Sequence, residues 1–300
     1  MRKHLISKLI ERARVDEAPF LVVGDLGYGV IEPFKDEFPD RYLNVGVAEQ
    51  AGIGISAGLS RSYLPFFYSI GNFPSMRALE QIRNDVAHED NPVVVVSLGA
   101  GFSYGPAGYS HHAIEDAGAV ASIMGMTVFT PACVHELDEI LSSTWLNPRP
   151  MYLRLGSNET CAITHQEFEF EFCSVWQQGS SDTVIVAHGE IVQVVAEAVR
   201  GLEPSPTVLT ISQFNADQEQ LALQLKGYEQ VVTVEEHFVE GGFGTRIASA
   251  LANTPAQISR LGVRNYDSHV GGSPQFMREQ NSLDAESIRE FLVTFGYGRT

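Results

Sequence analysis

The sequence predicts an α/β protein built from two doubly wound domains, and three observations support this fold class. Short apolar runs rich in β-branched residues alternate with segments of helical periodicity, as in a parallel sheet covered by helices. The run at 93–98 is almost continuously hydrophobic, as expected of a strand buried on both faces. The alternation stops in a polar, acidic stretch at 157–180 and then resumes, which indicates two domains joined by a linker.

The elements of the first domain, predicted at 1–156, follow in order. Residues 1–15 alternate basic and apolar side chains at helical spacing and predict a first helix. Strands are then predicted at 20–24, 64–68, 93–98, 127–130 and 151–155. Helices are predicted between them at 48–60, 75–88, 114–124 and 134–145. The second, smaller domain is predicted at 181–300, with strands at 183–187, 207–211, 231–234 and 258–263.

Composition limits the possible partners. The chain has 300 residues, 44% of them hydrophobic, and a net charge of −17, which disfavours nucleic acids and anionic membrane surfaces as ligands. No apolar run approaches the ~20 residues of a membrane span, and the amino terminus lacks the apolar core of a signal peptide. Cys133, Cys161 and Cys173 are widely spaced and predict neither a disulfide framework nor a zinc site. A cytoplasmic location is therefore expected.

One carboxylate is placed where chemistry is expected. Glu49 begins a predicted helix rich in glycine and alanine, between apolar runs at 21–23 and 66–68. A desolvated carboxyl group there could share a proton with a ligand nitrogen. The alternative is an ordinary acidic residue in a first helical turn, where negative charge is favourable in any protein.

Four motifs in a fixed order decide between these interpretations: GDLGYG at 24–29, RYLNVGVAEQ at 41–50, PFFYSIGNFPSMRALEQIRNDVA at 65–87 and GPAGYSHHAIED at 105–116. Together they resemble the pyrimidine-binding domain of the transketolase family of thiamine-diphosphate enzymes. VEEHFVEGGFG at 234–244 resembles a segment of the family's carboxy-terminal domain, with glycines whose backbone amides could bind an anion. The resemblance covers nearly the whole chain.

The resemblance assigns a cofactor role to residues of the first three motifs. In the family, a carboxyl group is hydrogen-bonded to the aminopyrimidine ring nitrogen. This bond switches the aminopyrimidine to its imino form, which removes the proton from the thiazolium carbon. Glu49 matches this carboxyl group, with Asp25 and Gly46 in the adjoining cofactor-binding segments. Phe73 is expected to stack on the pyrimidine and Phe67 to line its pocket. For Phe67, core packing is an equally good explanation, because consecutive strand residues face opposite ways.

Two adjacent histidines, His111 and His112, follow a glycine-rich loop at 99–108. Such loops at the carboxyl ends of parallel strands are where these folds bind ligands. The resemblance gives His111 a contact with the reacting oxygen of the substrate. His112 stands where the family usually has glutamine, and we expect it to be catalytic as well. The alternative for any single histidine is an inert surface position.

The family's magnesium motif for the diphosphate, G-D-G with a downstream asparagine, does not occur in the sequence. The resemblance therefore implies a partner subunit that holds the diphosphate and Mg²⁺, with no metal ligand in this chain. Split transketolases and two-subunit 2-oxo-acid dehydrogenases have this arrangement, and an α2β2 heterotetramer is expected.

The substrate is expected to be a sugar. Arg2 matches a phosphate-contacting arginine of central-metabolic transketolases, but Gly29, Gly99 and Ala107 replace three other substrate contacts. We predict that Arg2, Arg154 and the position of Gly99 contact the substrate, whose phosphate lies elsewhere or is absent.

Three functions remain. The first is the pyrimidine-binding subunit of a split transketolase-like enzyme that transfers a two-carbon ketol or acyl unit between sugars, one of them modified or nucleotide-linked. The others are a β subunit of a 2-oxo-acid dehydrogenase and a non-catalytic regulatory subunit.

Overall fold

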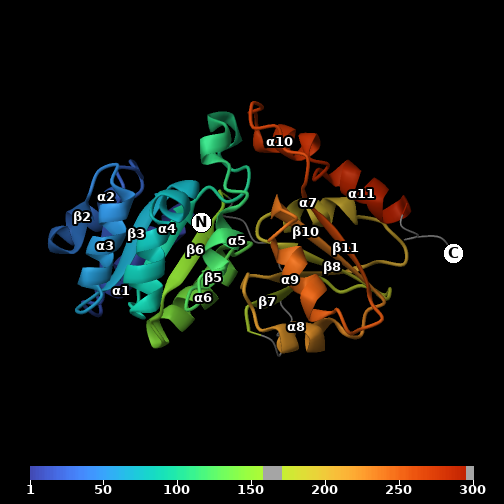
Figure 1. Ribbon diagram of the computed structural model, residues 1–300, viewed down its shortest axis with the longest axis horizontal. Coiled ribbons are helices and arrows are strands. Elements are labelled where there is room, and N and C mark those ends of the chain that lie inside the picture. Colours follow the sequence, from blue (N-terminus) through green and yellow to red (C-terminus); the bar gives the residue numbers. More distant parts are fainter. Residues whose placement is uncertain (158–170, 295–300) are drawn as a thin grey trace.

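The computed structural model describes residues 1–157 and 171–294, and two sheets lie side by side in it (Figure 1). The first is a six-stranded sheet in which all strands are parallel, in the order β2-β1-β3-β4-β6-β5. Its strands are β1 (Pro19–Val23), β2 (Tyr42–Asn44), β3 (Leu64–Ile70), β4 (Val94–Leu98), β5 (Thr127–Phe129) and β6 (Met151–Leu155). The predicted α/β fold is confirmed.

Helices cover both faces of this sheet. One face packs on α1 (Arg2–Ala13), α2 (Glu32–Glu37) and α6 (Val134–Leu146). The other packs on α3 (Glu49–Leu59), α5 (Asp116–Ala121) and η3 (Ile82–His88). Short turns complete the domain: η1 (Pro39–Arg41), η2 (Phe73–Arg77), α4 (Leu79–Gln81), η4 (Gly105–Ala107) and η5 (Tyr109–His111).

The second sheet has five strands in the order β11-β10-β8-β9-β7. Its strands are β7 (Cys173–Gln177), β8 (Thr183–His188), β9 (Thr207–Ile211), β10 (Gln230–Phe238) and β11 (Gln257–Val263). Only β7 is antiparallel, at the edge of the sheet beside β9. Helices α7 (Val192–Ala198), α10 (Pro274–Gln280) and α11 (Ala285–Thr294) pack on one face, and α8 (Gln218–Leu225) and α9 (Phe243–Ala250) on the other.

Three details differ from the predictions. Cys173–Gln177 forms β7, so the second domain begins inside the predicted linker of 157–180, most of whose other residues lie outside the described ones. The predicted helix at 75–88 is divided into η2, α4 and η3. Cys133 is disulfide-bonded, a bond that the cysteine spacing did not predict.

The two domains are joined by a continuous apolar core, because one buried cluster contains residues of α3 and α5 together with residues of α8 and α9. Within residues 1–157 and 171–294, we find no helix with the length and hydropathy of a membrane span.

Candidate functional site

The site is built at the carboxyl ends of the first sheet, where the chain turns from β2 into α3. Asp25, in a left-handed conformation (φ 55°), accepts hydrogen bonds from the Asn44 amide at 3.2 Å and the Tyr28 hydroxyl at 2.9 Å. Asn44 in turn accepts one from the backbone N–H of Gly46 at 2.9 Å. These bonds tie the two predicted cofactor-binding residues, Asp25 and Gly46, into one turn that leads to Glu49.

Glu49 is the first residue of α3 and only 4% exposed. Its depth follows from the contact of α3 with β3: a Cβ on Gly52 would lie 2.2 Å from the Phe67 ring, so only glycine lets the helix approach so closely. Phe67 is itself fully buried beneath α3. Phe67 packs against the helix that carries Glu49 and presents no surface to a ligand. This placement fits core packing, the alternative explanation for Phe67.

Arg77 connects Glu49 to Phe73. Its Nη1 donates to both carboxylate oxygens of Glu49 at 3.3 Å, and its guanidinium lies 4.1 Å from the centre of the Phe73 ring. The Arg77 side chain is 49% exposed. Sequence reasoning missed this residue; its place four residues after Phe73 in the helical segment was the available signal.

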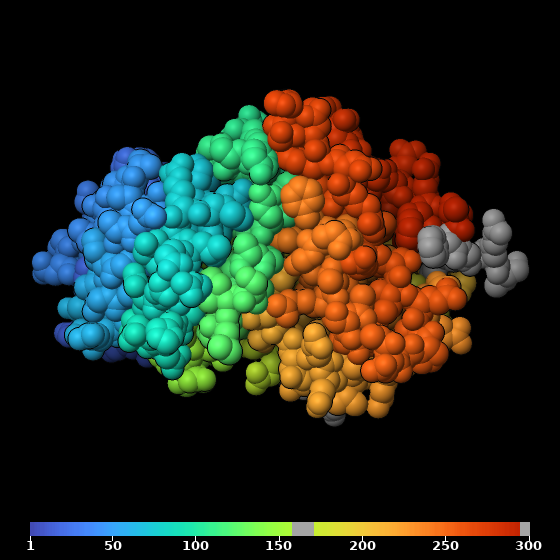
Figure 2. Space-filling view, in the orientation of Figure 1, coloured from blue at the N-terminus to red at the C-terminus, as the bar shows by residue number. Residues whose placement is uncertain are grey.

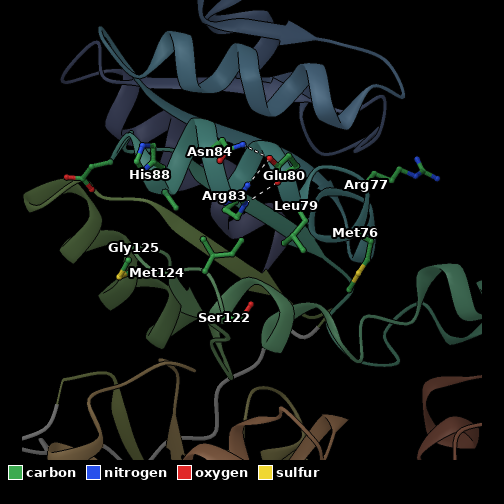
Figure 3. Close-up of a pocket in the computed structure, with 13 residues that line it drawn as sticks. Met76, Arg77, Leu79, Glu80, Arg83, Asn84, His88, Ser122, Met124 and Gly125 are labelled. Carbon is green, nitrogen blue, oxygen red and sulfur yellow. Dashed lines mark hydrogen bonds and ion pairs between the residues drawn. The ribbon is translucent and has the colours of Figure 1, made fainter.

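Arg77 also borders a groove of about 1200 Å³ beside the site, which Met76, Glu80, Arg83 and Met124 help to line. Figure 3 shows the Arg77 side chain extending away from the other groove residues, while Glu80 and Arg83 pair with each other. The guanidinium therefore belongs to the Glu49 site and not to the groove.

His111 closes the other side of Phe73, with the two rings edge to face at 5.2 Å. Its Nδ1 shares a hydrogen bond with the Ser110 hydroxyl at 2.9 Å, and no described residue bonds to Nε2. Partial burial lowers the pKa of His111, and the electrostatic effects of the neighbouring His112 and Arg77 side chains lower it further. The ring is thus favoured in its neutral form, with one nitrogen available to a ligand.

Arg2 and Gly99 lie on the same side of the site as His111. Gly99 has φ +88°, and a Cβ there would lie 2.1 Å from the Tyr104 ring. Tyr104 packs against His111 with ring centres 6.4 Å apart, and its hydroxyl accepts a hydrogen bond from Arg2 at 3.3 Å. The structure therefore brings Glu49, Phe73 and His111 together. Arg2 and Gly99 both contact Tyr104, which packs on His111.

His112 faces the opposite way from His111 and is completely buried. Its Nε2 bonds to the carbonyl of Gly105 at 2.8 Å, and its Nδ1 bonds to the hydroxyl of Tyr266. Both ring nitrogens are occupied, so His112 has no free nitrogen for a substrate. The expectation that His112 contacts the substrate does not fit this placement.

Arg154 is the second prediction that the structure corrects. Its side chain is 3% exposed, and its Nε donates to both carboxylate oxygens of Asp116 at 3.0 and 3.1 Å. Its Nη2 donates to the carbonyls of Ala113 and Glu236. The guanidinium joins the two domains and is not available to a bound anion.

The glycine-rich turn of the second domain likewise holds an internal carboxylate. The backbone N–H groups of Phe243 and Gly244, at the start of α9, donate to Glu235 at 2.7 and 2.8 Å. Burial raises the pKa of Glu235 to about 7, against the lowering effect of these bonds. The backbone amides that could have bound an anion are therefore occupied by a side chain of the protein itself.

The two domains match two known domain models in order. Residues 1–161 match the transketolase pyrimidine binding domain and residues 174–288 the transketolase C-terminal domain. Fold and site therefore define a pyrimidine-binding domain followed by a transketolase carboxy-terminal domain. The chain belongs to the transketolase family.

Two curated relatives that match along nearly their full length are transketolase subunits. One component of the apulose-4-phosphate transketolase of Actinobacillus succinogenes is 30% identical over 97% of this chain and 98% of its own length. The 6-deoxy-6-sulfo-D-fructose transketolase subunit SqwH of a Clostridium species is 29% identical over 96% of this chain and 92% of its own. A solved split-gene transketolase, described as an inactive β4 tetramer, superposes with a TM-score of 0.83 at 27% identity, covering 99% and 98% of the two chains.

Proposed function

We propose that this chain is the pyrimidine-binding subunit of a split, thiamine-diphosphate-dependent transketolase-like enzyme that transfers a two-carbon ketol or acyl unit between sugars. The observation that carries the proposal is the cluster of Glu49, Phe73 and His111, a buried carboxylate, a half-buried ring and a histidine with a free nitrogen, at the carboxyl ends of the first sheet. The full-length likeness to components of split transketolases supports it.

The residues present suit the pyrimidine end of the cofactor. The carboxyl group of Glu49 can share a proton with the ring nitrogen, and Phe73 presents an aromatic face beside it, which the Arg77 side chain covers in this structure. When bound, thiamine diphosphate supplies the nucleophilic carbon of its thiazolium ring. Glu49 holds a proton at the pyrimidine nitrogen, Phe73 orients the ring, and His111 donates to or accepts from the reacting oxygen of the sugar through Nε2.

The diphosphate and its Mg²⁺ are assigned to a separate subunit, in a proposed α2β2 complex in the cytoplasm. The names of two relatives, for apulose 4-phosphate and for a sulfonated fructose, support a modified sugar as substrate. Arg2, exposed and beside Tyr104, is the cation proposed to meet an anionic group of that sugar.

The test is reconstitution. This chain is purified with candidate partner subunits, supplied with thiamine diphosphate and Mg²⁺, and assayed for two-carbon transfer with ketose phosphates and modified sugars as donors and acceptors. Transfer that is lost in Glu49→Gln supports the proposal. Decarboxylation of 2-oxo acids with docking to a lipoyl-bearing core would instead identify a dehydrogenase subunit, and full activity of the Glu49→Gln complex would identify a regulatory one.

A further inference from the structure

The loop that carries His111, residues 99–113, is held by the second domain as well as by the first. On the side of the first domain, Gly99 and Ala100 donate backbone hydrogen bonds to the carbonyl of Leu155 at 2.8 and 3.1 Å. Gly101 and Ala113 exchange two backbone hydrogen bonds of 3.0 Å and close the loop at its base. These bonds fix the ends of the loop, but among the described residues no backbone hydrogen bond joins its tip, η4 and η5, to a strand of the first sheet.

The tip rests on the second domain instead. The backbone N–H of Gly272 donates to the carbonyl of Gly105 at 3.2 Å, and a Cβ on Gly105 would lie 2.4 Å from the carbonyl oxygen of Gly272. The backbone N–H of Phe102 donates to Glu236, whose carboxylate also pairs with Arg278 of α10. In Figures 1 and 2 this tip, in green, meets the segment around α10, in red, at the top of the molecule.

At the centre of this contact is the pair of His112 and Tyr266. A carbonyl oxygen can only accept, so His112 Nε2 carries a proton and donates to Gly105. In neutral His112, Nδ1 is then an acceptor, and the hydroxyl of Tyr266 donates to it. The Tyr266 ring also stacks on Phe102, with ring centres 6.3 Å apart and planes 25° from parallel. One tyrosine of the second domain thus fixes the rotation of His112.

Fixing His112 also fixes the backbone of its neighbour. The carbonyl of His112 accepts a hydrogen bond from the amide of Asn72 at 2.6 Å, and the backbone N–H of His111 donates to Gly108 at 2.9 Å. Backbone hydrogen bonds on both sides of the His111–His112 pair therefore direct the His111 ring toward Phe73.

We propose that Tyr266 is a positioning residue for the reaction: acting through His112, the second domain sets the direction of His111 in the active site of the first. This inference rests on the proposed role of His111 in the proposed function. It gives the carboxy-terminal domain a part in catalysis although no residue of that domain contacts Glu49, Phe73 or His111 by a ring contact, ion pair or hydrogen bond among the described residues.

The test compares Tyr266→Phe, which removes only the donated hydrogen bond, with Tyr63→Phe. Tyr63 is a matched control because it is also half-buried and packs on a phenylalanine, at 5.2 Å from Phe20, away from the loop. Hydrogen exchange of residues 99–113 and an NMR titration of His111 are measured on the full chain without cofactor. Tyr266→Phe is expected to raise exchange in the loop about tenfold, and Tyr63→Phe to leave it unchanged.

The titration separates positioning from general stability. Burial, His112 and Arg77 all lower the pKa of His111 in the intact loop, so a loosened loop moves this pKa up toward its ordinary value. In a reconstituted complex, Tyr266→Phe is expected to lower kcat at least about tenfold, while the KM for the donor stays within about twofold of the wild-type value. Wild-type exchange and an unchanged His111 titration in folded Tyr266→Phe would overturn the inference, as would global unfolding of that variant, because the assigned role is local. The two cofactor-free measurements stand whether or not the proposed function does.

Discussion

The molecule holds two polar clusters of similar composition and opposite character. The site cluster contains Glu49 with Arg77, and His111 beside them; the junction cluster contains Asp116 with Arg154, and His112 close by. In the site cluster the ion pair is 3.3 Å long and the arginine side chain 49% exposed. In the junction cluster the corresponding values are 3.0 Å and 3%.

The difference shows how environment decides the use of one side-chain type. In the junction cluster both nitrogens of His112 and both carboxylate oxygens of Asp116 are bonded to protein groups, so no ligand can compete without leaving a buried polar group unpaired. In the site cluster Arg77 is reachable from solvent, and the His111 Nε2 is free of described partners. A ligand can replace these contacts at little cost.

The largest expected effect belongs to the site cluster. Glu49→Gln keeps the size of the side chain but removes the carboxylate, so two-carbon transfer by the reconstituted complex should fall by at least about a thousandfold. Glu80→Gln is the control, because Glu80 is also paired with an arginine but is exposed. Steady-state turnover of the two variants makes the comparison. Equal losses in the two variants would mean that the effect is not specific to the carboxylate of Glu49.

Breaking the junction cluster should affect stability instead. Arg154→Met leaves Asp116 charged and buried without its partner, which should lower the free energy of unfolding by about 3 to 5 kcal/mol. Urea denaturation measures it. A loss below about 1 kcal/mol would mean that the Arg154–Asp116 pair contributes no more than an ordinary surface ion pair, and that the two clusters do not differ in stability.

Two buried histidines of the second domain are expected to make the free energy of unfolding fall at acid pH. Burial lowers the pKa of His188 to about 3 and of His237 to about 4, with the charge of Arg154 adding to both effects. The unfolded chain therefore binds more protons than the folded one between about pH 6.5 and 4, and each histidine lowers stability by about 1.4 kcal/mol per pH unit as the pH falls.

Glu235 acts in the opposite sense, because its folded pKa of about 7 lies above the ordinary value of a glutamate. The stability that Glu235 contributes is fully present below about pH 4.5 and is lost as the pH rises through about 7. His188→Phe, which keeps a ring against Phe243, should reduce the acid slope by about 1.4 kcal/mol per pH unit. Unfolding curves between pH 4 and 6.5 measure it, and an unaltered slope would show that His188 is not buried in the neutral form.

The smallest expected effect concerns Arg77. Because this side chain is half-exposed, Arg77→Ala should change the free energy of unfolding by less than about 1 kcal/mol. It also uncovers Glu49 and the face of Phe73, so the complex should bind thiamine diphosphate about two- to fivefold more tightly. Calorimetry on wild-type and variant complexes tests this. Weaker binding by the variant would mean that Arg77 stays in contact with the cofactor.

Most of the fold could be predicted from the sequence, because buried parallel strands leave strong apolar runs. Every predicted strand is present within about one to four residues of its predicted ends. β2 was missed because it is a short edge strand with exposed residues, and β7 because its pairing with β9 is a long-range antiparallel contact inside a polar stretch. The pattern of apolar residues within a segment does not show which distant strand that segment pairs with.

The site was predicted in part, through the motifs and not through composition. Arg77 links Glu49 to Phe73, and Phe73 packs on His111, while the roles given to Glu49, Phe73 and His111 stay predictions. His112 and Arg154 were placed wrongly because adjacent or similar residues cannot be told apart without knowing which way each side chain points. Arg77 was missed because its contact with Glu49 joins residues 28 positions apart.

We propose that half of a cofactor site lies in this chain, and calorimetric titration of thiamine diphosphate with Mg²⁺ tests this directly. The titration is made into this chain, into the candidate partner subunit and into their complex. We expect saturable binding by the complex alone, and we expect this binding to be lost or weakened when Phe73 is changed to alanine. Tight binding by this chain without a partner would contradict it.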